Sequence, residues 1–496
     1  MPQQSAAAPS RAAPRASLLV SNAHVLSMDE ARNEFLPGYV AIRDDVIVGV
    51  GPQQACPSGA DRVIDAAGKV ALPGFVNAHT HAIHILMRGG LSDDRPRYDW
   101  LFNVILPGLA VYGRADIELA ARLYCMEALL SGITTFVDNV EFPVDRFDMA
   151  ADTAIGVYRR MGPRVIYARM FYDYAPPDLA PLVEAAQARE PGVRHPADGF
   201  EPTAAALASI DELIRRHHGS ADGRIQVWPS PGVAILCSRE GLLGAKDLAR
   251  RRGTRLTLHL AESPQDRYQS GMTSIEYLGS IEYLGSIGFL GPEVLAGHCV
   301  QACSSDIRTL KAFDVKVANN AVSNLFLGSG IAPVAEMQAA GITVGLGTDD
   351  ANCNNSVNMI SDMKFAALVQ KGRYGRASAM TAERVLAMAA IDGARAQWPT
   401  RSDRWRSGRR QIWCSWISPA RICTPGTASV PRSSTRRTEA RWTPSSSTAG
   451  YSWRQASSPA WGRTGPPCQR AQQASARVAR RARLADYPSR CCTQLS

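Results

Sequence analysis

The first part of the chain alternates apolar and polar residues in short runs. Residues 17–71 contain the runs SLLVSNAHVLSM, GYVAIRDDVIVGVG, DRVIDA and KVALPG, which are separated by turn residues. Alternation with a period of two, interrupted by Gly, Pro, Asn and Asp, is typical of half-buried β-strands. This region therefore predicts a small sheet of short strands. Residues 1–16 before it are rich in Ala and Pro and are expected to be disordered.

From about Phe75 the pattern changes to short apolar runs that alternate with helical stretches. The strand candidates are ITTFVD, RVIYARMFYD, RIQVWPSPG, RLTLHLAES, VLAGHCV, VKVANN and ITVGLGTDD. Segments such as ADIELAARLYCMEALLSG and EGLLGAKDLARRRG lie between them and predict helices that end near a Gly. Such alternation over about 300 residues predicts parallel βα units, in either a closed barrel or an open doubly wound sheet.

One short repeat interrupts this pattern. SIEYLG occupies 274–279 and again 280–285, and SIGFLG follows at 286–291. The units are too short and too few for a solenoid. We interpret them as a small tandem duplication in a surface helix.

Two histidines follow the apolar run VALPGFV. In a strand, side chains at i and i+2 point to the same side, so His79 and His81 of NAHTH face one side together. Two imidazoles at one strand end can clamp a metal ion. His84, three residues on, is expected to line or pack the pocket rather than to bind metal.

Three later strand candidates also end in titratable residues. His259 ends RLTLHL and is followed by Glu262, His298 ends VLAGHCV, and Asp349 ends ITVGLGTD. Barrel enzymes place catalytic residues at the C-terminal ends of their strands. Each residue alone could be a buried core side chain or a helix cap, but the four strand ends together indicate a site. Asp349 and Asp350 could divide the roles, one as metal ligand and the other as helix cap or substrate contact.

This set of residues is sufficient for metal-assisted hydrolysis. Three neutral imidazoles and one carboxylate leave a divalent ion with an open position for water, and the ion lowers the pKa of that water toward neutrality. Asp349 could accept the water's proton, while Glu262 protonates a ring nitrogen of the substrate and then the departing group. His298 would polarise the attacked centre or hold the water. RIQVWPSPG contains no Lys, so we expect one divalent ion and no carboxylated Lys bridging two.

The motifs PGFVNAHTH, LHLAES, AGHCV and GLGTDD resemble those of the amidohydrolase superfamily, in its cytosine-deaminase-like branch. YDWLFNV, SGITT, VYARMF, VWPSP and TDDANCNNSVNMISDMKF are similar to the s-triazine hydrolases, the group of melamine deaminase and atrazine chlorohydrolase. The resemblance covers residues 18–396. It implies a (β/α)8 TIM barrel with a small β-sandwich built from both termini. It also implies that His79, His81, His259 and Asp349 bind one Zn²⁺ or Fe²⁺, and that Glu262, His298 and Asp349 are catalytic.

The substrate and the leaving group are less clearly indicated. Asp350, Cys353 and Asp138 resemble the deaminase rather than the chlorohydrolase, and an additional acid suits the protonation of an amino leaving group. We therefore expect these three residues, with Trp100 of YDWLFNV, to bind an aminated N-heterocycle such as an s-triazine, purine or pyrimidine. Arg97, Val233-Ala234-Ile235 and Gly271 differ from both relatives. The alternatives are a hydrolytic dechlorinase of chloro-s-triazines and an inactive product of a damaged gene.

Charge changes the interpretation of the last hundred residues. The net charge is +10, but residues 397–496 contain 18 Arg, no Lys and three acids, so residues 1–396 carry a net charge of −5. A basic balance confined to one segment without an amphipathic stripe does not indicate nucleic-acid binding. No apolar run is long enough to span a bilayer, no signal sequence is recognisable, and the scattered cysteines suit a reducing cytosol. We expect a cytoplasmic enzyme with a small heterocyclic substrate, no nucleic-acid or membrane partner, and assembly into a homo-oligomer.

The tail also lacks a motif that the resemblance predicts. Such proteins continue with a segment like IGSLEPGKxADLVLLD, whereas residues 401–418 are RSDRWRSGRRQIWCSWIS. These residues can be back-translated so that reading from the third base gives IGSLEVGKTADLVLLDLA. Our hypothesis is a slip of the reading frame between about Ala396 and Arg401. We therefore divide the chain into residues 1–16, sandwich strands at 17–71, a barrel at 72–396 and an aberrant, disordered tail at 397–496. The sandwich would be incomplete, with open strand edges and an uncovered apolar face.

Overall fold

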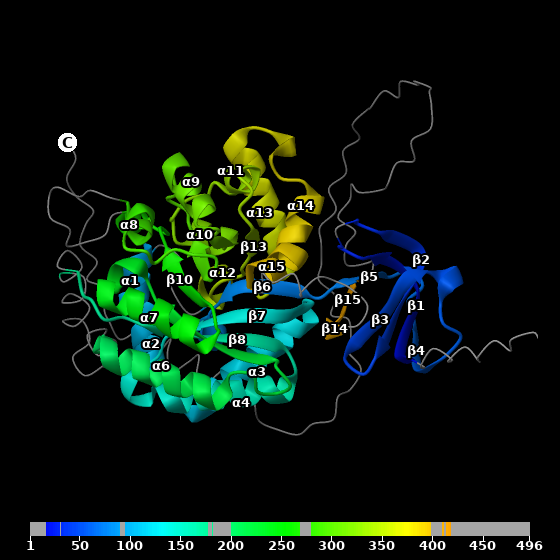
Figure 1. The fold of residues 1–496 in the computed structure, drawn as a ribbon, viewed down its shortest axis with the longest axis horizontal. Coiled ribbons are helices and arrows are strands. Elements are labelled where there is room, and N and C mark those ends of the chain that lie inside the picture. The colour runs from blue at the N-terminus through cyan, green and yellow to red at the C-terminus, as the bar shows by residue number, and fades with distance from the viewer. Residues whose placement is uncertain are drawn as a thin grey trace, which may run out of the picture.

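The computed structural model of the chain describes residues 16–29, 31–89, 95–176, 181, 200–267, 279–397, 409–410 and 413–417. Its centre consists of eight parallel strands in two four-stranded sheets (Figure 1). All seven strand candidates after Phe75 form strands. The strands are β6 (Phe75–Thr80), β7 (Ile133–Val140), β8 (Arg164–Phe171), β9 (Ile225–Pro231), β10 (Leu256–Leu260), β11 (Val294–His298), β12 (Lys316–Asn319) and β13 (Val344–Leu346).

Two parallel bridges join these sheets into a ring. Thr80 beside β6 pairs with Asp349 after β13, and Val233 after β9 pairs with His259 of β10. The backbone N–H of Asp349 donates to the His79 carbonyl over 3.0 Å, and that of His259 donates to the Gly232 carbonyl over 3.0 Å. The strands therefore follow one another from β6 to β13 and back to β6. This order is that of the expected (β/α)8 barrel, with a single bridge at each seam between the two sheets.

The helices lie outside this ring (Figure 1). The two predicted helices appear as α3 and α7, and α7 ends before Gly253, whose φ of +64° suits a residue without a Cβ. The helices are α1 (Arg97–Trp100), α2 (Leu106–Ala110), α3 (Arg114–Leu130), α4 (Phe147–Met161), α6 (Thr203–His217), α7 (Arg239–Arg252), α8 (Ser280–Ser286), α9 (Ser304–Ala312), α10 (Ala321–Phe326), α11 (Val334–Ala339), α12 (Ala351–Asn354), α13 (Met359–Tyr374), α14 (Ala382–Ala387) and α15 (Gly393–Gln397).

Short helical turns connect several of these elements. Most are 3₁₀ turns, and two are π-helical. The 3₁₀ turns are η1 (Gln53–Ala55), η2 (Ala82–Met87), η4 (Val144–Arg146), η7 (Ala234–Leu236), η8 (Pro264–Arg267) and η9 (Ala377–Ala379); the π-helical turns are η3 (Leu101–Ile105) and η10 (Met388–Asp392).

The interior of the ring is filled by side chains. Trp228 of β9 is fully buried and packs in a small cluster with strand residues such as Ala78, Ile166 and Leu295. A much larger apolar cluster lies between the strands and the surrounding helices. The barrel is thus a packed core, and polar side chains can gather only at its ends.

The N-terminal strands form a separate sheet beside the barrel (Figure 1). They are β1 (Ala16–Leu26), β2 (Glu34–Arg43), β3 (Val46–Pro52), β4 (Ala60–Asp65) and β5 (Val70–Pro73). Two segments of the tail, β14 (Arg409–Arg410) and β15 (Trp413–Ile417), pair with β3 and β5 in antiparallel fashion.

These pairings correct the expected open edges in part. β15 pairs with β5 over Val70–Pro73, whereas β14 pairs with β3 only at Val46 and Ile47. The apolar face is not uncovered, since Val20, Val40 and Ile47 are buried. The predicted disorder of residues 1–15 and of most of the tail lies outside the described residues.

The duplicated hexapeptide is seen only in part. The second copy forms α8, in which Ile281 and Leu284 are buried. Residues 274–278 of the first copy lie outside the described residues. Helix α8 therefore packs one face inward, and only part of it is exposed, as expected for a helix on a barrel's outer layer.

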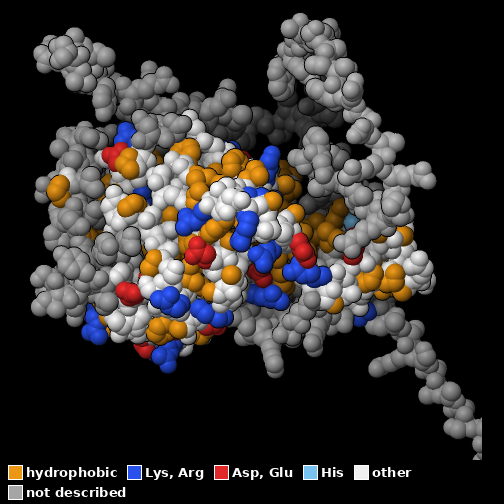
Figure 2. Space-filling view, turned by 90° about the horizontal axis from the view of Figure 1, so that it is seen from above, with side chains coloured by type: hydrophobic (Ala, Val, Ile, Leu, Met, Phe, Trp, Pro, Cys, Tyr) orange, Lys and Arg blue, Asp and Glu red, His pale blue; other side chains and the backbone are white. Residues whose placement is uncertain are grey.

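The described surface carries both signs of charge. Lys and Arg side chains lie interspersed with Asp and Glu on the face seen in Figure 2. None of the helices in the described part of the chain is both long and apolar enough to cross a bilayer.

Candidate metal centre and active site

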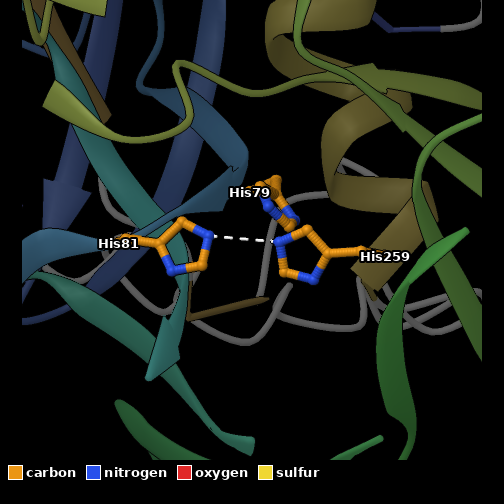
Figure 3. Close-up of side chains that lie close together, drawn as sticks. All are labelled: His79, His81 and His259. Atoms are coloured by element: carbon orange, nitrogen blue, oxygen red, sulfur yellow. Dashed lines mark hydrogen bonds between the residues drawn. The ribbon is translucent and has the colours of Figure 1, made fainter. Parts of the chain in front are cut away.

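The predicted ligands come from three strand ends of the barrel. His79 and His81 lie at the end of β6, His259 lies on β10, and Asp349 follows β13. Figure 3 shows the imidazoles of His79, His81 and His259 converging from β6 and β10. All four side chains are buried. The structure therefore brings together residues that are up to 270 positions apart in sequence.

The distances between these side chains are those of a ligand set. The Nε2 atoms of His81 and His259 are 3.2 Å apart. Oδ1 of Asp349 lies 3.5 Å from Nε2 of His79 and 3.6 Å from Nε2 of His81. His79 Nε2 is buried and has no hydrogen-bond partner among the described residues. Imidazole nitrogens and a carboxylate oxygen that converge on one point, one of them without a hydrogen-bond partner, fit a divalent cation.

Backbone and amide groups orient two of the imidazoles. Nδ1 of His259 lies 2.6 Å from the Gly232 carbonyl oxygen, to which it donates. Nδ1 of His79 lies 3.1 Å from the side-chain amide of Asn139. Both contacts direct Nε2 at the common point, and the donation from Nδ1 of His259 is the kind of bond that metal-binding histidines make to their outer partners.

Burial fixes the protonation states that metal binding requires. It lowers the pKa of His79 and of His81 to about 3 and that of His259 well below its usual value. Burial alone would raise the pKa of Asp349, but the charges of His298 and the other histidines outweigh it and lower the pKa to about 2. Near neutral pH the site thus offers neutral imidazoles and an ionised carboxylate.

The backbone at these strand ends is strained. His298 has a φ of +71° and Asp349 a φ of +58°, in the left-handed region that side chains with a Cβ rarely adopt. Such residues cost about 1–3 kcal/mol each and cluster at functional sites. A Cβ on Gly347 would lie 2.9 Å from the Cβ of His79, so only glycine lets β13 approach β6 here. The positions of these two side chains therefore lower the stability of the fold.

Two carboxyl groups flank His298. Its Nε2 lies 3.6 Å from Oε2 of Glu262 and 3.7 Å from Oδ2 of Asp349. Its Nδ1 lies 2.8 Å from Oδ1 of Asn324, which holds the ring in place. Burial raises the pKa of Glu262, although Arg97 and His298 partly offset this effect. The pKa of one carboxyl is thus lowered and that of the other is raised, the separation expected of a base and an acid.

A pocket opens onto this group of residues. Its lining combines titratable side chains of the site with apolar and aromatic ones. Trp100 lines it and is fixed by a hydrogen bond of 2.6 Å from its indole Nε1 to Asn352. The lining residues are His81, Arg97, Trp100, Leu101, Glu141, Met170, Tyr172, Val233, His259, Glu262, His298, Leu327 and Asp349.

The other predicted substrate-binding residues lie behind this lining. Asp350 caps α12, and its Oδ2 lies 2.5 Å from Nδ1 of His84. Asp138 accepts hydrogen bonds from the backbone N–H of Ala82 and the hydroxyl of Tyr158. The pocket lining includes neither aspartate.

Cys353 also lies behind the lining. Its Sγ is 3.1 Å from the hydroxyl of Ser323. That hydroxyl in turn hydrogen-bonds Asp349 and helps to lower its pKa. Cys353 is therefore connected to the metal ligands through one intervening side chain.

Sequence reasoning missed Glu141 and Tyr172 and did not assign Arg97 a role in the site. Glu141 follows β7 directly, so the signal that identified Asp349, an acid after an apolar strand, was also present here. Its Oε2 accepts a hydrogen bond of 2.5 Å from the Tyr172 hydroxyl. Arg97 and Val233, two of the positions at which the chain differs from the s-triazine hydrolases, line the pocket, while Gly271 lies outside the described residues.

Known proteins with similar sequences are hydrolases. The chain is 34% identical over 383 residues to the S-triazine hydrolase of Gordonia rubripertincta, covering 76% of this chain and 78% of the relative. It is 34% identical over 387 residues to a 5'-deoxyadenosine deaminase of Methanosarcina acetivorans, covering 77% and 80%. It is 36% identical over 384 residues to a 5-methylthioadenosine/S-adenosylhomocysteine deaminase of Desulforudis audaxviator, covering 76% and 79%.

Solved structures share the fold. A mutant atrazine chlorohydrolase of Arthrobacter aurescens, complexed with zinc and atraton, superimposes with a TM-score of 0.69 at 25% identity over 79% of this chain and 85% of the other. An adenosine deaminase of Xanthomonas campestris with bound zinc gives a TM-score of 0.66 at 24% identity, covering 78% and 81%. Residues 70–397 match the amidohydrolase family. The barrel, its converging strand-end ligands and these similarities show that the chain belongs to the amidohydrolase family of hydrolases.

Proposed function

We propose that the protein is a metal-dependent aminohydrolase that deaminates an aminated N-heterocycle. The observation that supports this best is the position of His298 between two carboxyl groups, Glu262 and Asp349. The pKa of the first is raised and that of the second is lowered. An amino group is a poor leaving group unless it is protonated, so a deaminase needs an acid that can supply a proton. Burial raises the pKa of Glu262, which is the direction that such an acid requires. Deaminases among the similar proteins add support.

The residues that would hold the ion are His79, His81, His259 and Asp349. We propose Zn²⁺, which the donor set of nitrogen and carboxylate oxygen suits and which two of the similar solved structures contain. When bound, such an ion makes water more acidic and so supplies hydroxide at neutral pH. Fe²⁺ is the alternative for the same ligands.

The two oxygens of Asp349 have different neighbours. Oδ1 faces the imidazoles of His79 and His81, while Oδ2 faces His298. Oδ1 would therefore serve as ligand and Oδ2 would accept a proton from the attacking water. Glu262 would donate its proton to the ring nitrogen beside the attacked carbon and regain one for the departing amine. Over the cycle, the water oxygen bonds to the ring carbon, the carbon–nitrogen bond breaks, and one water proton leaves with ammonia.

The test is product release from matched substrates. The zinc-loaded protein is incubated with amino-s-triazines, aminopurines and aminopyrimidines, and with the chloro-s-triazines that correspond to the first group. We expect ammonia from amino compounds and little chloride. Chloride without ammonia would identify a dechlorinase, and neither product would contradict a hydrolase of these heterocycles.

A further inference from the structure

Arg97 is buried in the pocket wall beside the residues proposed to transfer protons. Its Nε forms an ion pair with Oε2 of Glu262. The same Oε2 lies 3.6 Å from Nε2 of His298. The three side chains therefore succeed one another along the pocket, in the order His298, Glu262, Arg97.

The order of the three side chains indicates which atom of a bound heterocycle lies beside each of them. In the proposed function, His298 faces the carbon that is attacked and Glu262 the ring nitrogen next to it. Arg97 then lies beside the following ring atom, on the far side of that nitrogen. A guanidinium carries only hydrogen-bond donors, so the group it meets there must be an acceptor.

Neighbouring side chains hold the guanidinium of Arg97 in position. One terminal nitrogen, NH1, donates to Asp266 over 3.1 and 3.2 Å, and the aromatic ring of Tyr98 lies 4.9 Å from Cζ. Asp266 is itself fixed, because it accepts from the backbone N–H groups of Glu262 and Ser263 over 3.2 and 2.9 Å. The contacts with Glu262 and Asp266 use Nε and NH1, whereas the guanidinium has five N–H donors in all.

We propose that Arg97 determines specificity for a heterocycle that carries a carbonyl oxygen next to the protonated ring nitrogen. The recognised unit is an amino carbon, a ring nitrogen and a carbonyl carbon in succession. Amino-oxo-triazines and aminopyrimidinones whose intervening ring nitrogen carries no hydrogen contain it, whereas melamine and 2-amino-1,3,5-triazine do not. This inference rests on the proposed aminohydrolase function and specifies its substrate class. Arg97 contacts the substrate here, in addition to its ion pair with Glu262.

The experiment compares pairs of substrates of which one carries that carbonyl oxygen and the other does not. Melamine is compared with 4,6-diamino-1,3,5-triazin-2-one, and 2-amino-1,3,5-triazine with 4-amino-1,3,5-triazin-2-one, using the full-length zinc-loaded protein. We expect kcat/KM to favour the oxo compound by roughly 10- to 100-fold, the contribution of a charge-assisted hydrogen bond. Arg97→Met should abolish this preference, and Arg97→Lys, which retains a charge, should keep part of it. The ratio within a pair is unaffected by the fraction of protein that folds.

Arg169→Met is the control. Arg169 is equally buried and is paired with Glu201, but it does not line the pocket. Its substitution should leave the ratio unchanged. A ratio that stays the same in Arg97→Met would overturn the inference and reduce Arg97 to a residue that only positions Glu262. Ammonia from all four compounds at equal rates would also overturn it, while leaving the aminohydrolase function intact.

Equilibrium binding gives a readout that does not depend on turnover. Calorimetry of the zinc-loaded protein with the same pairs should show tighter binding of the oxo compound, again lost in Arg97→Met. If no compound releases ammonia, the proposed function fails, and the binding ratio still decides whether Arg97 selects the oxygen.

Discussion

His81 and His259 approach each other with their Nε2 atoms only 3.2 Å apart, although β6 and β10 belong to different halves of the barrel. Burial keeps both imidazoles neutral near pH 7. The Nδ1 atom of His259 donates to Gly232, which leaves its Nε2 as an acceptor. Two nitrogens bound tetrahedrally to zinc at 2.0–2.1 Å would be about 3.3 Å apart. The pair is therefore already spaced as ligands of one ion.

Removal of one of these ligands should remove the metal. We expect His259→Asn to lose bound zinc and to reduce hydrolysis by more than about 100-fold, because even the loss of an outer partner costs 10- to 100-fold. Metal content measured by mass spectrometry checks this. His217→Asn, at an imidazole that pairs with Asp152 on the outer helices, should keep its metal. A His259→Asn protein with a full equivalent of zinc would contradict the ligand assignment.

Glu262→Gln should retain metal but lose turnover. Glutamine preserves the shape of the side chain but cannot supply a proton, so we expect kcat to fall by about 10²- to 10⁴-fold. Burial raises the pKa of Glu262, so the active protonated form declines as pH rises through that pKa. The wild-type pH–rate profile should therefore have an alkaline limb that the variant lacks. Glu201→Gln, at a buried carboxyl outside the pocket, serves as the control. An alkaline limb that persists in Glu262→Gln would assign it to another group.

The sequence predicted those site residues that lie at or near the ends of strands. The spacing of His79 and His81 by two residues, and acids or imidazoles at the ends of apolar runs, indicated residues that the structure brings together at one end of the barrel. The barrel itself followed from strand–helix alternation together with the resemblance.

Contacts between distant segments were not predictable in this way. His84 meets Asp350 across 266 residues, and Arg97 meets Asp266 across 169. Neither pair has a local spacing that marks it, because each is made only when the helical turns η2, α1 and η8 pack over the strand ends. Similarly, the backbone pairing of β15 with β5 could not be derived from a tail with few aliphatic residues.

Restoring the alternative reading frame should stabilise the protein. The frame that begins with IGSLEVGKTADLVLLDLA places Val-Leu-Leu-Asp-Leu at positions 413–417, where the chain forms β15. From residue 401 on, this frame also restores the segment that the resemblance predicts for completing the sandwich. The frame-restored protein should melt higher than the printed chain, by roughly 2–4 °C for each kcal/mol gained.

The DNA sequence of the gene provides an independent check of this prediction. Sequencing across codon 398 should reveal the inserted or missing base. An uninterrupted frame that encodes the printed tail, together with an equal Tm for the two proteins, would contradict the hypothesis of a frame slip.

Asp138 should make stability depend on pH. Burial raises its pKa from 3.8 to about 6, although Tyr158, the Ala82 N–H and His84 act in the opposite direction. Because the pKa is higher in the folded than in the unfolded chain, the protonated carboxyl stabilises the fold fully below pH 3.8, and this contribution is lost as pH rises through about 6. Two pKa units correspond to about 3 kcal/mol.

Asp138→Asn should therefore flatten this part of the pH dependence. Asparagine can still accept from the Ala82 N–H through its oxygen, so the variant keeps one of the two hydrogen bonds of the carboxyl. The free energy of unfolding, measured in urea between pH 4 and pH 7, should fall less steeply in the variant than in the wild type. Asp152→Asn, at a carboxyl exposed on α4, should leave the slope unchanged. Equal slopes in Asp138→Asn and wild type would show that the buried carboxyl does not titrate in this range. The same variant tests the predicted substrate contact: a KM that rises at unchanged kcat would indicate that Asp138 helps to bind the substrate from behind the pocket lining.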